Sequence, residues 1–327
     1  MSTTAESETW EEISGWLDTY LDDRPLVDIL EATETLEGAW VEGQWEQLDP
    51  WWEVNVESQG EALAELQEVL DSTGQVWQEA DCSMDEDPLV ADWATNHRSG
   101  PLRINQEENW SQWLAHVIRS GPSEFSRELF GDEFDVRPRS VEREVHLVDH
   151  GGTDRYADIV LYYVGRGISI EVKRGDSHYS KTTHTASLIE SQRAGNWEHF
   201  LLLPEYKTDT LRQSFGNDLE EPAEGRPFIR SDQSDDVTVL YWQEVSEAIR
   251  NVLLDGPETG SHWEASAYLL CTLVEQKVAQ FLPKSTVEEA TTASDIVSTA
   301  SSARLAGTDI ERQVAYLRRT MGRDNHE

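Results

Sequence analysis

A strand–turn–strand pattern between residues 157 and 173 constrains the fold of this chain more than any other segment. Residues 157–164 read Ala-Asp-Ile-Val-Leu-Tyr-Tyr-Val, an apolar, β-branched and aromatic run that is typical of a buried strand. Turn chemistry follows at Gly165-Arg166-Gly167, and residues 168–173 then alternate between apolar and polar side chains. The segment therefore predicts a β-hairpin with a buried first strand.

Charged side chains gather at one end of this hairpin. Alternation puts Glu171 and Lys173 on the same face of the second strand. Asp158, at the start of the first strand, lies beside them if the two strands are antiparallel. Carboxylate oxygens suit Mg²⁺, and a lysine beside the metal can orient water and offset developing negative charge. The pattern predicts a divalent-metal site that acts on a phosphodiester; the alternative is a same-face ion pair on an exposed strand.

A second Glu-x-Lys tripeptide shows that the tripeptide alone carries little information. Glu275-Gln-Lys277 lies inside a helical pattern without a hairpin, and we expect it to be a solvated surface. Lysine is scarce in the chain, with five residues in all. The functional prediction therefore rests on the hairpin, on the alternation and on the spacing to Asp158.

Residues 105–118 have the apolar stripe of a packed helix. The stripe consists of Trp110, Trp113, Leu114, Val117 and Ile118. Glu107 falls on the inward side of this helix, whereas Glu108 is rotated away from it. Glu107 is therefore the candidate for a further acid of the site, unless both glutamates only favour the positive end of the helix. Glu144, on the polar face of an alternating run at residues 141–148, either reaches the site or lies on the surface.

Asp158 followed by Glu171-Val-Lys173 resembles the signature of the PD-(D/E)XK nuclease superfamily. The resemblance spans roughly residues 100 to 285 and implies an α/β (α+β) fold with a restriction-endonuclease-like αβββαβ core and a mixed central sheet. Further core strands are then expected at residues 141–148, 199–203 and 237–242, with helices at 185–196 and 244–254. Ala157 stands where many members of the family carry a proline.

The same resemblance implies Mg²⁺-dependent hydrolysis of phosphodiesters, usually in DNA, with Mn²⁺ as a substitute. Asp158 and Glu171 would bind the metal together with the main-chain carbonyl of Val172. Lys173 would position and activate the water. Glu107 would complete the acid cluster or hold a second metal. The family's habits point to defence against foreign DNA or to repair.

The charge of the chain is extreme but uneven. There are 64 acidic against 26 basic residues, a formal net charge of −38. The acids are spread through regular helical and strand patterns, which indicates a solvated coat suited to molar salt and hence a halophilic, archaeal protein. At such salt, phosphate contacts gain little from counterion release, so a nuclease depends more on metal, shape and hydrogen bonds.

The segment around the hairpin is the least acidic part of the core. Residues 151–195 contain five acids and six bases, which favours the approach of phosphate. The residues predicted to contact nucleic acid are Arg155, Arg174, His178 and Lys181. The alternative for the segment after Lys173 is an ordinary polar loop.

Three regions are expected. Residues 1–95 carry 26 acids, one base and eight of the 13 Trp residues, and predict an acidic helical domain. This domain either packs or binds a partner, or it mimics DNA in the basic cleft. Residues 100–285 hold the nuclease-like domain, with plausible linkers at 81–88 and 97–101. Residues 286–327 form a Ser/Thr/Ala-rich linker or weak helix and then a last helix. This last helix is capped by Thr308 or Asp309 and docks on the protein, dimerises or touches nucleic acid.

Several functional classes are excluded. Cys82 and Cys271 are too few and too far apart for a zinc cage or a disulfide framework. No run approaches about 18 apolar residues and no signal peptide is present, so a soluble, cytoplasmic protein with no membrane partner is expected. A GxxxxGK[ST] loop is missing, so no nucleotide cofactor is expected.

The sequence thus predicts a metal-dependent nuclease acting on DNA. The alternative is a catalytically inactive nuclease-like module that binds DNA or a protein partner. Partners consistent with either reading are DNA, a second copy of the chain or an operon-encoded protein.

Overall fold

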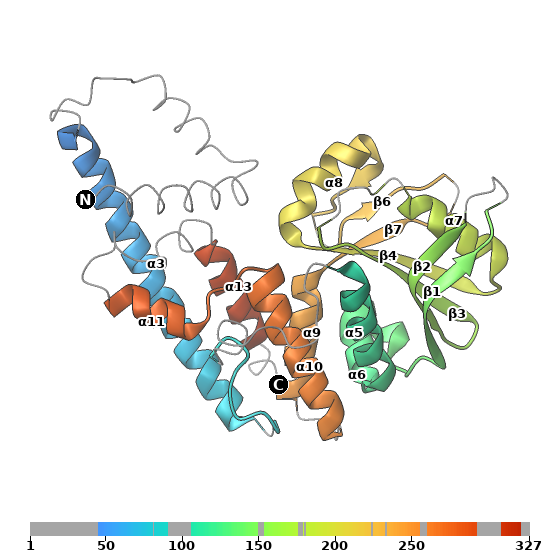
Figure 1. Cartoon of the computed structure of the whole chain (residues 1–327), viewed down its shortest axis with the longest axis horizontal. Coiled ribbons are helices and arrows are strands. Elements are labelled where there is room, and N and C mark those ends of the chain that lie inside the picture. The colour runs from blue at the N-terminus through green and yellow to red at the C-terminus, as the bar shows by residue number, and fades with distance from the viewer. Residues whose placement is uncertain are drawn as a thin grey trace, which may run out of the picture. The chain divides into compact units, whose positions relative to one another are not determined.

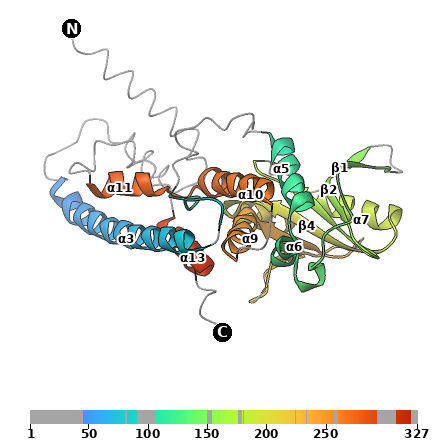
Figure 2. The same cartoon turned by 90° about the horizontal axis from the view of Figure 1, so that it is seen from below.

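The structure is a computed structural model of the 327-residue chain (Figures 1 and 2). It describes residues 45–80, 82–90, 106–149, 154–175, 179, 181–223, 225–232, 234–255, 260–292 and 309–321, with the backbone alone for 45–59 and 292. The chain divides into two units, residues 1–59 and 60–327. Of the first unit, the structure describes only the beginning of helix α3 (Trp45–Glu79). Most of the predicted acidic, Trp-rich domain therefore lies outside the described residues.

A seven-stranded mixed sheet runs through the second unit in the order β1-β2-β3-β4-β7-β6-β5. Its strands are β1 (Ser140–Leu147), β2 (Arg155–Tyr162), β3 (Arg166–Val172), β4 (Asn196–Leu203), β5 (Leu219–Glu220), β6 (Phe228–Ile229) and β7 (Val237–Tyr241). β1, β2 and β3 are antiparallel, β3, β4 and β7 are parallel, and β6 and β5 add an antiparallel edge. The predicted mixed α/β architecture with a mixed central sheet is confirmed.

The predicted hairpin is the β2–β3 pair, but its turn comes earlier than expected. β2 ends at Tyr162 and β3 already begins at Arg166. Gly165 in the turn has φ +75°, a conformation that glycine adopts at low cost. Gly167 lies inside β3, where the ring of Trp197 occupies the space that a Cβ atom would need. This glycine therefore serves close packing between β3 and β4, not the turn.

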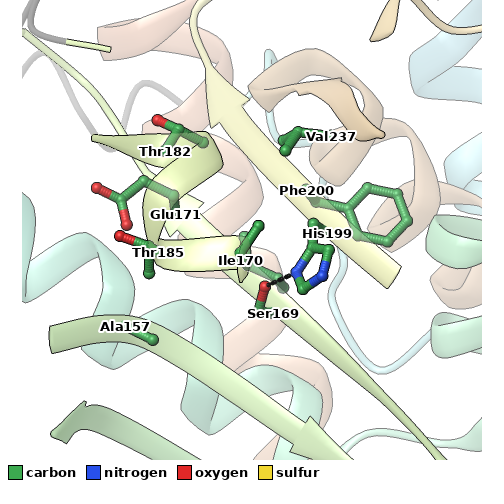
Figure 3. Close-up of a pocket in the computed structure, with 10 residues that line it drawn as sticks. Ala157, Ser169, Ile170, Glu171, Thr182, Thr185, His199, Phe200 and Val237 are labelled. Carbon is green, nitrogen blue, oxygen red and sulfur yellow. Dashed lines mark hydrogen bonds between the residues drawn. The ribbon is translucent and has the colours of Figure 1, made fainter. Parts of the chain in front are cut away.

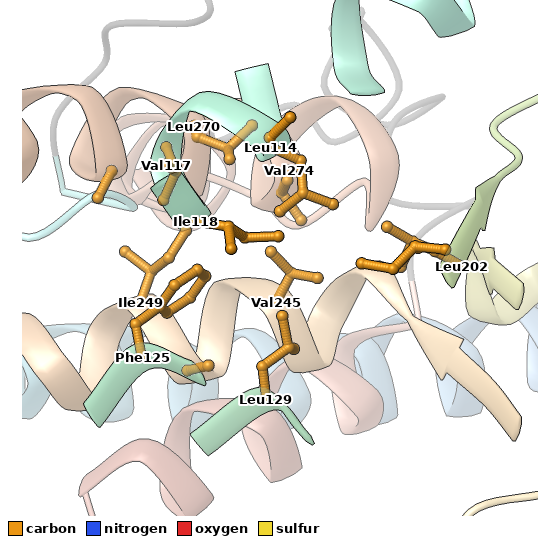
Figure 4. Packing of buried hydrophobic residues seen from close by; sticks show 14 of the residues in the cluster. Leu114, Val117, Ile118, Phe125, Leu129, Leu202, Val245, Ile249, Leu270 and Val274 are labelled. Carbon is orange, nitrogen blue, oxygen red and sulfur yellow. The ribbon is translucent and has the colours of Figure 1, made fainter. Parts of the chain in front are cut away.

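Three helices cover one face of the sheet: α5 (Glu107–Ser120), α6 (Ser123–Phe130) and α9 (Trp242–Leu254). Helix α10 (Ser261–Leu273) packs on α5 and α9. Figure 4 shows Leu114 and Ile118 of α5 packed with Val245 and Ile249 of α9. All four side chains are buried, and each such burial contributes about 1.5–3 kcal/mol. The predicted apolar stripe of α5 is thus in the core, and it fixes the position of the Glu107 end of the helix.

The opposite face of the sheet carries α7 (Thr182–Gln192). Leu188 and Ile189 of α7 pack in one cluster with Val160 of β2 and Trp197 of β4. Helix α8 (Thr208–Phe215) packs near β4 and β7 through Leu211. The helix predicted at 185–196 therefore exists, but it begins and ends earlier, and β4 takes up residues from 196 onward.

The apolar faces of amphipathic helices make a second core away from the sheet. Leu66 and Leu70 of α3 share this core with Phe281 and with Leu317 of α13 (Ile310–Met321). Asp309 caps α13 as predicted, since its Oδ1 accepts a hydrogen bond of 2.9 Å from the backbone N–H of Arg312. Helix α11 (Lys284–Thr292) forms the first part of the Ser/Thr/Ala-rich segment, in line with the weak-helix alternative. Of the three roles considered for the last helix, the structure shows docking within the chain. No helix among the described residues is long and apolar enough to span a membrane.

The expectation of a solvated surface at Glu275-Gln-Lys277 is wrong. Glu275 lies in a π-helical turn (Val274–Val278) and is fully buried. Its carboxylate accepts hydrogen bonds from Arg250, which also binds Asp87 at 2.5 Å. Asp87 is itself buried, although it falls in a segment predicted to be a linker. The local sequence pattern could not indicate this burial, because the cation that pairs with Glu275, Arg250, comes from a different helix.

Candidate active site

β2 and β3 separate at the end that carries the predicted acids. Their backbone pairing runs from Tyr162 opposite Gly167 to Ile159 opposite Ile170. One residue further on, Oδ2 of Asp158 accepts a hydrogen bond of 2.7 Å from the backbone N–H of Val172. The carboxylate thus replaces a strand partner, and this contact fixes Asp158 beside the last residue of β3.

Glu171 and Lys173 project from this end of β3 and contact each other. The distance from Lys173 Nζ to Glu171 Oε1 is 3.1 Å, and their side chains are only 13% and 14% exposed, respectively. The Lys173 backbone is held on both sides: its N–H donates to the carbonyl of Leu202 at 2.7 Å, and its carbonyl accepts from Trp242 Nε1 at 3.1 Å. Such enclosure separates this pair from an ordinary ion pair on an exposed strand.

Glu107 reaches the same place from the first turn of α5. Its Oε1 accepts hydrogen bonds from the backbone N–H groups of Arg174 (2.8 Å) and Gly175 (3.1 Å). Its Oε2 lies 4.0 Å from Lys173 Nζ. Glu108, one residue on, is exposed, and its carbonyl accepts hydrogen bonds from Ser111 Oγ at 3.0 Å and from Arg143 at 3.2 Å. The structure therefore brings together the four residues predicted from sequence: Glu107, Asp158, Glu171 and Lys173.

The electrostatics of the cluster are unbalanced towards negative charge. Burial and the neighbouring Glu171 carboxylate raise the pKa of Asp158 to about 7, against the lowering effect of the Val172 N–H and of Lys173. Burial alone would lower the pKa of Lys173, but the Glu171 and Asp158 carboxylates outweigh it and raise that pKa above its usual value. Three carboxylates thus share one ammonium group, and the cluster favours an additional proton or cation.

The donor chemistry of the cluster fits a hard divalent cation. Asp158 and Glu171 offer carboxylate oxygens at the end of β3, the ligand type that Mg²⁺ prefers. Over the part of the chain that the structure describes, no group of three or more His, Cys, Asp or Glu side chains is already arranged around a common metal position. Lys173 lies against Glu171 in this arrangement, so a cation would share that carboxylate with the ammonium group.

Of the residues predicted to contact nucleic acid, Arg174 lies at this cluster, since its backbone N–H donates to Glu107. Arg174 stacks its guanidinium over the Trp110 ring, with Cζ 5.2 Å from the ring centroid. Arg155 is half-buried at the start of β2, and Lys181 is exposed directly before α7. His178 lies outside the described residues.

Sequence reasoning missed the connection between the acid-bearing helix and the sheet. Arg143 of β1 donates to the carbonyl of Glu108 and to Ser111 Oγ of α5, and it pairs with Glu144 at 3.1 Å. Glu144 is largely exposed, which is the surface alternative considered for it. Its backbone has φ +49°, a strained conformation for a non-glycine residue. The β1–β2 register skips Glu144, which lies between the pairs Arg143–Ile159 and Val145–Ala157. Arg143, a basic residue within a strand of this acidic chain, was the sequence feature that could have indicated this contact between β1 and α5.

A polar network and a small pocket lie under α7, next to Glu171. Ser169 Oγ is 2.6 Å from His199 Nδ1, and His199 Nε2 is 3.1 Å from Glu190 Oε1 on α7. Figure 3 shows Ser169 and His199 joined in the pocket that Glu171 and Thr182 also line. Burial lowers the pKa of His199 more than Glu190 raises it, which favours a neutral ring. Although Ser, His and Glu are the residue types of a nucleophilic triad, Ser169 is buried in mid-strand. The network therefore holds α7 on the sheet.

No protein-family model, curated protein or solved structure shows significant similarity to this chain. The functional argument consequently rests on the geometry and chemistry of the site.

Proposed function

We propose that this chain is a metal-dependent nuclease of the PD-(D/E)XK type that hydrolyses phosphodiester bonds in DNA. The observation that supports it most is the meeting of Glu107, Asp158, Glu171 and Lys173 at one end of β2 and β3. Ordinary folding gives no reason to concentrate three carboxylates on one half-buried lysine, whereas binding of a cation and a phosphate does.

The order of the elements supports the same proposal. Helices α5 and α6 precede β1, β2 and β3, then α7 crosses one face of the sheet and β4 follows parallel to β3. This order is consistent with the αβββαβ arrangement that the sequence resemblance implies. Asp158 and Glu171 lie where β2 and β3 separate, which agrees with the position of the acids in that signature.

Each residue of the cluster has a role that follows from its contacts. A divalent cation held by Asp158, Glu171 and the carbonyl of Val172 would supply Lewis-acid stabilisation of the charge that develops on the phosphate. Lys173, kept protonated by its carboxylate neighbours, orients the attacking water and stabilises the negative charge on the phosphate oxygens.

Glu107 organises the strand end that bears the other three residues. By accepting from the N–H groups of Arg174 and Gly175, it fixes the backbone that follows Lys173. Its second oxygen, 4.0 Å from Lys173 Nζ, is placed to attract the ammonium group when a cation binds Glu171. Positioning of this kind is a large part of catalysis in phosphoryl transfer.

Lysine replacement tests the proposal with a control that the chain itself supplies. The full chain in molar KCl with Mg²⁺ or Mn²⁺ is offered supercoiled, linear duplex and single-stranded DNA, and RNA. Lys173→Ala is expected to reduce cleavage by about 10²–10³-fold, because a preorganised charge at the reacting phosphate is lost. Lys277→Ala, in the other Glu-x-Lys tripeptide, is expected to leave cleavage unchanged. Cleavage that survives Lys173→Ala in a folded protein contradicts the proposal.

The rival is a nuclease-like module that binds without cutting. The observation in its favour is that Lys173 already neutralises part of the cluster through Glu171 and Glu107. If the wild-type protein binds DNA and cuts none of the four substrates with either metal, the rival replaces the nuclease proposal.

A further inference from the structure

A rigid turn directly after β4 presents an exposed tyrosine beside the acid cluster. The turn is a 3₁₀ helix (Glu205–Lys207), closed by a 3.0 Å hydrogen bond from the Lys207 N–H to the Pro204 carbonyl. Thr208 Oγ1 donates to the Glu205 carbonyl at 2.6 Å, and Gln243 holds the Glu205 carboxylate at 3.1 Å. Between these fixed neighbours Tyr206 is 44% exposed. The ring is therefore held in place from its backbone while it remains open to a partner.

Two cations accompany this tyrosine. Lys207 Nζ lies 5.8 Å from the Tyr206 ring centroid. Arg174 lies close enough to both Tyr206 and Glu107 to interact electrostatically with them. The strand that leads into the turn runs beside the cluster, because the Leu202 carbonyl accepts a hydrogen bond of 2.7 Å from the Lys173 N–H. Because the Arg174 N–H is also hydrogen-bonded to Glu107, this arginine connects the tyrosine to the acid cluster. Stacking of its guanidinium on Trp110 fixes its orientation.

A single exposed tyrosine is unremarkable on most proteins. Among the described Phe, Tyr and Trp residues, the exposed side chains are those of Tyr156 and Tyr206. Tyr156 packs on His146, with ring centroids 5.2 Å apart. Tyr206 differs in having cationic neighbours, a fixed turn and a connection through Arg174 to the acids. These features match the way proteins hold single strands, by aromatic rings for bases and cations for the backbone.

We propose that Tyr206, flanked by Arg174 and Lys207, stacks on an unpaired base of the strand whose phosphate enters the acid cluster. This inference rests on the proposed nuclease function and names its substrate class as single-stranded or frayed DNA. Stacking suits a protein adapted to molar salt, because it depends on contact between ring faces and not on counterion release. An intact duplex would have to unstack a base to use the same contact.

The test is binding of a single-stranded oligonucleotide of about 12 nucleotides that carries one 2-aminopurine, in Ca²⁺ to hold the complex uncleaved. Stacking on the protein quenches the probe, and titration gives the affinity. Tyr206→Leu is expected to abolish the quenching and weaken binding about 10-fold, the equivalent of one lost base–aromatic stack. Tyr206→Phe, which keeps the ring, is expected to retain both within about twofold. Tyr156→Leu is the matched control for loss of an exposed tyrosine and is expected to behave as wild type.

Wild-type quenching and affinity in Tyr206→Leu overturn the inference. An equal loss of quenching and affinity in Tyr156→Leu also overturns the inference, because the effect would then not be specific to the tyrosine beside Arg174. Cleavage separates this failure from that of the nuclease. A protein that cuts through Lys173 but ignores Tyr206→Leu disproves the stacking contact alone. One that quenches the probe through Tyr206 and cuts nothing disproves the nuclease and keeps the contact.

Discussion

The two Glu-x-Lys tripeptides of this chain lie in opposite electrostatic settings. In the hairpin, Glu171 pairs with the lysine of its own tripeptide and lies beside two further carboxylates. In the π-helical turn, Glu275 is fully buried and pairs with Arg250, from a helix that precedes it in the chain. The same three-letter pattern therefore serves different purposes, and the difference lies in how completely each carboxylate is satisfied.

The Arg250 cluster is closed. Asp87 accepts from two guanidinium nitrogens of Arg250 and from the N–H of Leu89. Glu275 accepts from Arg250 and from the hydroxyl of Tyr316 at 2.6 Å. Every carboxylate oxygen has a donor, as buried charge requires. In the hairpin cluster, by contrast, the pKa of Asp158 is raised to about 7 by burial and by Glu171. The closed cluster suits stability, and the open one suits a ligand.

The largest effect should come from opening the closed cluster. Arg250→Ala leaves two buried carboxylates without their cation, and we expect the free energy of unfolding to fall by about 3–5 kcal/mol. Urea unfolding at fixed KCl measures it. Arg212→Ala is the control, because that arginine is 52% exposed and solvent screens its ion pairs. A loss at Arg250 no larger than at Arg212 would show that the buried network contributes little.

Exchange of each glutamate for its amide should separate the two clusters by function. Glu171→Gln is expected to lower cleavage by about 10²–10³-fold, since a metal ligand and the partner of Lys173 are lost. Glu275→Gln is expected to lower the unfolding free energy while the surviving folded protein cuts at the wild-type rate. Cleavage assays and urea unfolding on the same two proteins give the comparison. The reverse pattern, activity lost at Glu275 and kept at Glu171, contradicts the assignment of both.

Local patterns in the sequence were enough to find the open cluster. Alternation placed Glu171 and Lys173 on one face, the antiparallel hairpin placed Asp158 beside them, and helical periodicity turned Glu107 inward. All these relations depend on repeat lengths of two or 3.6 residues, which sequence displays directly. The four residues meet as those periods require.

The closed cluster could not be found in this way. Glu275 appeared solvated because its cation, Arg250, and its partner Asp87 lie far away in sequence, and Asp87 falls in a segment without regular pattern. The hairpin turn was misplaced for a related reason. Gly167 looks like turn chemistry, but its role is to admit the Trp197 ring from β4. Contacts made by tertiary packing leave no local signal of this kind.

The ionised Asp158 carboxylate should destabilise the folded protein, and substitution by an amide should remove this destabilisation. The pKa of Asp158 is raised from 3.8 to about 7, so the stability it contributes is full below about pH 4 and is lost as the pH rises through about 7. The amide side chain of Asp158→Asn cannot ionise. We therefore expect the free energy of unfolding of this variant to be about 1–2 kcal/mol higher than that of the wild type at pH 8. The difference should shrink towards pH 4. Urea unfolding across this range checks it; a variant less stable than wild type at pH 8 contradicts the raised pKa.

The smallest effect concerns the competition between a proton and a cation for the same carboxylates. A divalent cation binds the ionised form of Asp158, so its apparent affinity should weaken up to tenfold per unit as the pH falls below about 7. In thermal unfolding at fixed KCl, added Mg²⁺ should therefore raise the midpoint temperature more at pH 8 than at about pH 6.

Two variants serve as controls for this pH dependence. The midpoint of Asp158→Asn should respond to Mg²⁺ weakly and equally at both pH values. Glu275→Gln, altered in the closed cluster, should keep the wild-type difference between the two pH values. An equal response of wild type at both pH values means that the cation does not bind at Asp158, and the open cluster then holds its extra charge for another ligand.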